Sequence, residues 1–136
     1  MTEVVWQARG VVKGRATGAA LVSRTALSFL GDLDIRTGRV VGRSSDLMGE
    51  LVSGRVLVLP ASRGSAGAWR FLYQLRTHGT HPAGMILREM PDPSLTQGAI
   101  LAGIPILVDP EPAFWSDLSD GAVLQVDGDS GRIVRS

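Results

Sequence analysis

The segment GRVLVLPASRGSAG, residues 54–67, decides the fold that the sequence predicts. Its first half, residues 55–59, is a short apolar run typical of a strand buried on both faces, and Pro60 stops it. A loop rich in glycine and serine follows over 61–67. Beyond the loop, apolar residues recur near helical spacing, and Gly79 closes the predicted helix. The order along the chain is therefore strand, loop and helix.

The segments on the C-terminal side extend this unit. Residues 83–87 form the next apolar run, and the helix before them can make a right-handed crossover to a parallel strand. Ser94 can cap a second helix that runs to Leu101 and stops at Gly103. A further strand is predicted over 104–108. Together these elements predict a βαβ arrangement with three strands.

The two ends of the chain predict a β layer. Residues 4–12 alternate and then run apolar, which indicates one strand ending at Gly14. Residues 13–54 are rich in Gly, Ser and Thr and predict short strands with tight turns. Residues 121–134 predict a hairpin that rejoins the layer of the first strand. We find no repeat or linker, so the fold class expected is α/β, as a single domain over 1–136 with a parallel βαβ portion and a β layer.

Composition limits the possible functions. With 136 residues, 44% hydrophobic and 20% charged, the chain can bury one core. A formal charge of +1, with basic residues scattered singly, does not favour a nucleic-acid partner. The chain has no cysteine, which excludes disulfides and metal ligation by its own sulfur. No apolar run approaches the roughly 18 residues of a membrane helix, and no leader is evident, so we expect a cytoplasmic protein without a membrane partner.

The loop after the 55–59 strand is the candidate site. Gly64 and Gly67 would let backbone N–H groups approach a ligand, and the start of the following helix favours an anion. Arg63 could hold a carboxylate or phosphate with two hydrogen bonds, and Ser65 offers a hydroxyl. The alternative is that Ser65 only caps the helix and the glycines only make the turn. The Walker spacing and its lysine are missing, so the loop is not a nucleotide-binding P-loop.

Other polar and aromatic groups have simpler explanations. His78 and His81 lack a third ligand at regular spacing, so we interpret them as a helix end and a loop. Glu89 and Asp92 follow Arg88 and an apolar strand, where α/β sheets place ligands, but a solvated turn explains them equally well. The aromatic residues fit a core or a partner surface. They are Trp69, Phe71, Tyr73, Phe114 and Trp115.

The chain resembles the small, swivel-domain subunit of aconitase X over residues 8 to 134. The most specific parts of the likeness are RGS at 63–65 and GAILAGIP at 98–105. The other matching motifs are SFLG at 28–31, GRVLVLPAS at 54–62 and HPA at 81–83. The resemblance implies a swivelling β/β/α domain that closes over the active site of a larger enzyme.

The same resemblance implies a function. In that family a large subunit holds an iron or iron-sulfur centre through its own cysteines, so we expect no cofactor and no metal on this chain. Members are hydro-lyases that dehydrate cis-3-hydroxy-L-proline in bacteria or phosphomevalonate in archaea. We expect a dehydratase subunit that is inactive without its large subunit and acts on cis-3-hydroxy-L-proline, with phosphomevalonate as the alternative.

The family's functional residues map onto the loop. Its serine falls on Ser65, which is the predicted catalytic residue. Two positions depart from the family pattern and bear on the choice of substrate: Asp32 stands where a second glycine is usual, and Ala66 where Ser or Thr is common. The residues predicted to bind the small anionic substrate are Arg63, Gly64, Ala66 and Gly67.

Two other classes of function remain open. Residues 103–108 and 120–129 resemble the phosphohistidine swivel domain of phosphoenolpyruvate-utilising enzymes. That family has a histidine after the threonine, whereas Gln97 follows Thr96 here and offers no nucleophilic nitrogen. A non-catalytic binding module would keep the fold and leave the loop without a role. The absence of a neighbouring gene for a cysteine-bearing large subunit would favour that module.

Overall fold

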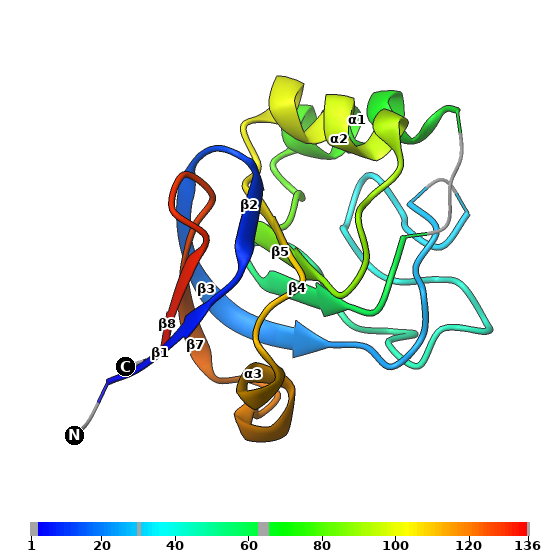
Figure 1. Ribbon diagram of the computed structural model, residues 1–136. Coiled ribbons are helices and arrows are strands. Elements are labelled where there is room, and N and C mark those ends of the chain that lie inside the picture. The colour runs from blue at the N-terminus through cyan, green and yellow to red at the C-terminus, as the bar shows by residue number, and fades with distance from the viewer. Residues whose placement is uncertain (1–2, 30, 63–65, 136) are drawn as a thin grey trace.

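The computed structural model in Figure 1 describes residues 3–29, 31–62 and 66–135. Within them, eight strands form one sheet in the order β1-β8-β7-β3-β4-β5-β6-β2, accompanied by three helices. None of these helices is long and apolar enough to cross a bilayer. The elements are β1 (Val4–Gln7), β2 (Arg9–Val12), β3 (Arg15–Val22), β4 (Val56–Leu59), α1 (Ala68–His78), β5 (Gly84–Leu87), α2 (Pro93–Ala102), β6 (Ile106–Val108), α3 (Pro112–Asp117), β7 (Val123–Asp127) and β8 (Arg132–Arg135).

The parallel half of the sheet confirms the predicted βαβ arrangement. Strands β4, β5 and β6 pair in parallel, α1 connects β4 to β5, and α2 connects β5 to β6. The sequence predicted three strands here, but β3 adds a fourth, parallel to β4. Gly18 lies within β3. A larger residue does not fit there, because a Cβ at this position would lie 2.5 Å from the carbonyl oxygen of Gly54. A glycine that interrupts the apolar pattern therefore marks a close strand contact, which residue spacing did not reveal.

Strand β4 is central and apolar on both faces, as predicted. Leu57 and Leu59 pack in the core cluster that α1 and α2 cover. Val56 and Val58 point to the other face, into the cluster shared with the antiparallel strands and α3. All four side chains are fully buried.

The antiparallel half joins the two ends of the chain. The predicted hairpin is β7 and β8, and β8 pairs with β1, as expected. The single strand predicted over 4–12 is wrong, because Ala8 divides it into β1 and β2. The Ala8 N–H donates to the carbonyl of Gly131, and β2 then pairs with β6 at the other end of the strand order. One apolar run thus serves two different edges of the sheet.

The crossing of β2 over the β7–β8 turn depends on glycine. A Cβ at Gly128 would overlap the carbonyl oxygen of Val12, and one at Gly10 would overlap the carbonyl of Gly128. We expect Gly128→Ala to lower the free energy of unfolding by about 1–3 kcal/mol, the usual cost of overpacking. Denaturant unfolding would measure it, with Gly31→Ala as the control, since a Cβ there meets only the Ser28 hydroxyl at 3.9 Å. Equal free energies of unfolding for the two variants would contradict a close backbone contact at Gly128.

Between β3 and β4, the described residues form turns with single β-bridges in place of the short strands predicted. These bridges join Leu33 to Val40, Arg39 to Leu51, and Leu27 to Ser62. The segment 31–55 contributes Val40, Leu47 and Val52 to the core beneath the helices. It therefore packs as part of the domain although it carries no extended strand.

Candidate functional site

The candidate site lies where the parallel strands end. Strands β3, β4 and β5 run in the same direction, so their carboxyl ends share one edge of the sheet, the usual position of ligand sites in α/β folds. The loop 60–67 leaves β4 at this edge. Its beginning lies beside the segment after β3, because Leu27 and Ser62 form a parallel bridge and the Leu27 N–H donates to Ala61 at 3.3 Å.

Three predicted site residues, Arg63, Gly64 and Ser65, lie outside the described residues. The structure does place Ala66, which is exposed, and Gly67, which is half-buried and is the N-cap residue of α1. These two predicted substrate-binding residues therefore lie together at the start of the helix. The exposure of Ala66 means that a ligand or a partner could reach this position.

The first turn of α2 holds both ends of the loop. The Ser62 hydroxyl donates to a carboxylate oxygen of Asp92 at 3.4 Å. The Ser94 hydroxyl donates to the carbonyl of Ala66 at 3.1 Å and accepts from the backbone N–H of Trp69, also at 3.1 Å. Only residues 63–65 lie between the two anchored ends.

The residue predicted to cap α2 is wrong by two positions. Asp92 is the N-cap and accepts from the Leu95 N–H at 3.0 Å, because Pro93 occupies the first helical position and leaves Asp92 extended. Ser94 therefore lies inside the helix, and its hydroxyl is available to α1. An Asp-Pro pair before an apolar run was the signal that could have found this cap.

The start of α1 is capped by another helix. Its N-cap residue, Gly67, has no side chain, and the Trp69 N–H is instead satisfied by Ser94 of α2. Helices leave their first N–H groups without intrahelical partners, and this contact from α2 supplies the partner of one of them. The N-cap residue is thus Gly67; Ser65 lies outside the described residues, and both of its predicted roles stay predictions.

Asp32, which departs from the family pattern, closes a turn beside the site. It is only 8% exposed, and its carboxylate accepts from the Ser28 N–H at 2.9 Å. The carbonyl of Asp32 also accepts from Val41 and Gly42. Because a Cβ at Gly42 would overlap the Asp32 carboxylate, the two residues depend on each other. In this chain the departure has a local structural role.

A second carboxylate attaches the 31–55 segment to the end of β3. Asp46 accepts from the Ser23 hydroxyl at 2.5 Å, from the Arg24 N–H at 2.8 Å and from the Thr25 hydroxyl at 3.2 Å. Burial acts to raise the pKa of Asp46, but these hydrogen bonds outweigh it and hold the pKa below the ordinary value. The carboxylate therefore remains ionised as an anchor at neutral pH.

A hollow of about 320 Å³ lies at the carboxyl edge. Two arginines line it, and the guanidinium of Arg88 lies 4.2 Å from the ring centre of Trp115. Within the described part of the chain, neither Arg24 nor Arg88 forms an ion pair with a carboxylate. The other lining residues are Val22, Ser23 and Pro60. Two carboxylates also lie at this edge, because Asp46 accepts from the Arg24 N–H and Asp120 accepts from the Val22 N–H at 2.9 Å.

The two histidines lie at the far end of α1 from the loop. His78 is the last residue of the helix, and His81 follows it in a loop, as predicted. Burial, aided by the nearby Arg76 charge, lowers the pKa of His81 below its ordinary value. The described residues contain no group of three or more His, Cys, Asp or Glu that could hold a metal ion, so they do not fit an iron centre.

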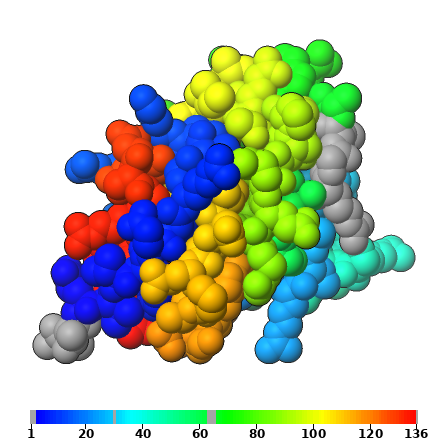
Figure 2. Space-filling model, viewed as in Figure 1, coloured from blue at the N-terminus to red at the C-terminus, as the bar shows by residue number. Residues whose placement is uncertain are grey.

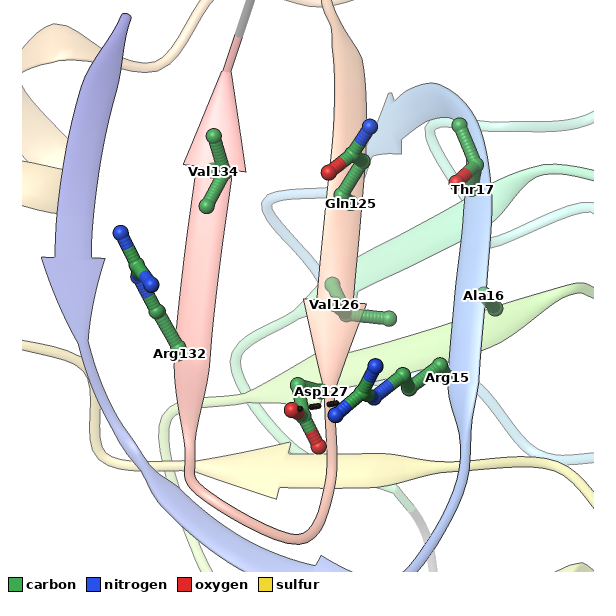
Figure 3. Close-up of a pocket in the computed structure, with 8 residues that line it drawn as sticks. All are labelled: Arg15, Ala16, Thr17, Gln125, Val126, Asp127, Arg132 and Val134. Carbon is green, nitrogen blue, oxygen red and sulfur yellow. Dashed lines mark ion pairs between the residues drawn. The ribbon is translucent and has the colours of Figure 1, made fainter.

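A larger groove, of about 580 Å³, lies on the outer face of β3, β7 and β8 (Figure 3). Arg15 and Asp127 form an ion pair across it at 3.3 Å, although the Arg15 side chain is 81% exposed. Polar residues alternate along these strands, as on the solvated face of an antiparallel sheet. Neither Ala66 nor Gly67, the predicted site residues that the structure describes, lines this groove, and Figure 1 shows β7 and β8 on the opposite side of the domain from the start of α1.

Known proteins resemble this chain in both sequence and fold. The model of the aconitase X swivel domain family matches residues 5–135. The phosphomevalonate dehydratase small subunit of Methanocella arvoryzae is 42% identical, over 90% of this chain and 92% of its own length. That of Pyrococcus furiosus is 38% identical, over 92% and 90% respectively. The crystal structure of Thermococcus kodakaraensis aconitase X in its holo-form matches with a TM-score of 0.89 and 33% identity, covering 98% of both chains.

Proposed function

Because the chain belongs to the aconitase X swivel domain family, we propose that it is the small subunit of a dehydratase that acts on phosphomevalonate. The observation that carries the proposal is the name shared by curated relatives that align over most of both lengths. These names favour the alternative substrate of the sequence analysis over cis-3-hydroxy-L-proline.

The charge at the carboxyl edge supports the same substrate. Phosphomevalonate carries both a carboxylate and a phosphate, whereas cis-3-hydroxy-L-proline is a zwitterion with no net charge at neutral pH. Arg24 and Arg88 face the hollow without carboxylate partners in the described part of the chain. The start of α1 adds a partial positive charge. A guanidinium without a carboxylate partner can bind a phosphate through two hydrogen bonds, and of the two compounds only phosphomevalonate offers a phosphate.

In the proposed reaction, Ser65 acts as the base. Its alkoxide takes the proton from the carbon next to the substrate carboxylate, and the electrons of that C–H bond form the new double bond. The neighbouring hydroxyl departs and becomes water by taking up a proton, which balances the proton released when Ser65 ionises. Backbone N–H groups of the loop and Arg63 would stabilise the alkoxide or hold the carboxylate.

We assign the iron or iron-sulfur centre to the large subunit, because this chain has no cysteine and its described residues contain no group of His, Asp or Glu that could hold a metal ion. The proposed complex forms in the cytoplasm. The docking surface that we propose includes exposed apolar side chains of the 31–55 segment, which are Val41, Met48 and Leu51. Asp46 ties this segment to the end of β3, so a partner docked there would also face the carboxyl edge.

The substrate is tested with this chain assembled with the cysteine-bearing large subunit that the proposal requires. We expect the complex to convert phosphomevalonate to its dehydrated product, detected by mass spectrometry as the loss of one water, and to leave cis-3-hydroxy-L-proline unchanged. If the complex turns over cis-3-hydroxy-L-proline and not phosphomevalonate, the proposed substrate is wrong. Turnover of neither compound would favour a binding module.

A further inference from the structure

The first turns of α1 and α2 lie side by side, and the contact between them points to a role for α2 in catalysis. We propose that Ser94 is a positioning residue, whose hydroxyl fixes Ala66 and the first turn of α1 directly after the proposed base. The inference rests on the proposed function, because it takes Ser65 as the base. It assigns a further task to α2, which connects β5 to β6 and covers the core.

The hydroxyl of Ser94 uses its donor and one acceptor on the same short region. It donates to the carbonyl of Ala66, which follows Ser65 in the chain, and accepts from Trp69, the second residue of α1. A serine hydroxyl has one proton and two lone pairs, so both contacts can exist at once. This single group therefore connects the loop to the helix whose positive end faces the site.

Gly98 lets the helices approach closely enough for this contact. It lies four residues after Ser94, on the same face of α2. A Cβ at Gly98 would lie 2.6 Å from the Cα of Trp69, nearer than any side chain can pack. The first glycine of the GAILAGIP motif thus allows the backbone of α1 to lie close to α2 at Trp69, the residue that donates to Ser94.

Asp92 completes the arrangement at the other end of the loop. One carboxylate oxygen caps α2 through Leu95, and the other accepts from Ser62. The start of α2 therefore contacts both Ser62 and Ala66, the described residues on either side of 63–65. Displacing a reacting group by about 1 Å can cost on the order of a hundredfold in rate, so losing either contact affects turnover more than folding.

The test compares Ser94→Ala with Ser94→Thr in the assembled complex, using phosphomevalonate as substrate. We expect Ser94→Ala to lower kcat by roughly 10- to 100-fold with little change in KM, whereas Ser94→Thr keeps the hydroxyl and most of the rate. Ser116→Ala is the matched control, because its hydroxyl makes only a 3.5 Å contact within α3. A kcat of Ser94→Ala within twofold of the wild type would overturn the proposal, as would equal losses in Ser94→Ala and Ser94→Thr.

A second measurement does not depend on activity. Hydrogen exchange of the Trp69 amide in the full chain should be faster in Ser94→Ala than in the wild type and unchanged in Ser116→Ala. If the wild-type complex turns over neither substrate but this amide responds, the proposed function fails and the anchoring by Ser94 stands. Unchanged exchange at Trp69 would overturn the anchoring even in an active enzyme.

Discussion

Replacing Ser65 with alanine in the assembled enzyme is expected to lower turnover by roughly a hundredfold or more, because the base for the carbon-bound proton is lost. A serine hydroxyl is a weak base unless its alkoxide is stabilised by donors fixed in advance. The proposed donors are the backbone N–H groups of the loop and Arg63. Rates with phosphomevalonate would be measured for the wild type, Ser65→Ala and the control Ser116→Ala.

Thermal unfolding separates this role from a structural one. A serine that only capped α1 would cost about 1 kcal/mol of stability when lost and leave turnover near normal. The N-cap position of α1 is Gly67, and Ser94 satisfies the Trp69 N–H. We expect Ser65→Ala to cost no more than about 1 kcal/mol of stability, since the Trp69 N–H keeps Ser94 as its partner. Near-normal turnover with a lowered melting temperature would show that the catalytic assignment is wrong.

The purified chain alone is expected to have no dehydratase activity and to gain it with a cysteine-bearing large subunit. The hydroxyl leaving group needs an activating group, and this chain has no cysteine to bind one. Phosphomevalonate turnover would be followed while the partner is titrated into a constant amount of this chain. Turnover by the single chain would contradict the division of labour between subunits.

Two surface variants test where the partner docks. Met48 is 58% exposed on the 31–55 segment, and Ile100 is 62% exposed on α2. Met48→Asp places a charge in the proposed apolar contact, so we expect it to raise the concentration of large subunit needed for half-maximal activity by about tenfold or more. Ile100→Asp should leave that concentration unchanged. The reverse result would show that the large subunit docks on the outer surface of α2 and not on the 31–55 segment.

The amino-acid sequence predicted only part of the candidate site. Arg63, Gly64 and Ser65 were found from a glycine-rich loop between an apolar strand and a helix, and their roles remain predictions. Asp92 was noticed but not as a cap, and the bridging role of Ser94 was missed. The partners of Ser94 lie 28 and 25 residues away along the chain, so no local spacing pointed to them.

Helix α3 illustrates the same limit within the fold. It has six residues, too few for a stable helix by propensity alone, and the sequence analysis did not predict it. Its Phe114 packs edge-to-face on Trp6 at 5.2 Å, and Glu111 before it accepts from the Gln7 N–H at 2.9 Å. Both contacts reach across more than a hundred residues of chain to β1. The helix forms where tertiary packing supports it.

The sequence by itself determined the elements with strong local signals: the buried strand β4, the helix closed by Gly79, the strand β5 and the hairpin of β7 and β8. Hydrophobic period, proline and glycine act within a few residues, so these patterns are visible without a partner strand. Only the tertiary structure decided that Ala8 splits the first strand, that β3 joins both halves of the sheet, and that α2 caps α1. Each of these depends on a hydrogen bond or a close backbone contact between segments far apart in the chain, and the free energy of such contacts exists only once the segments have met.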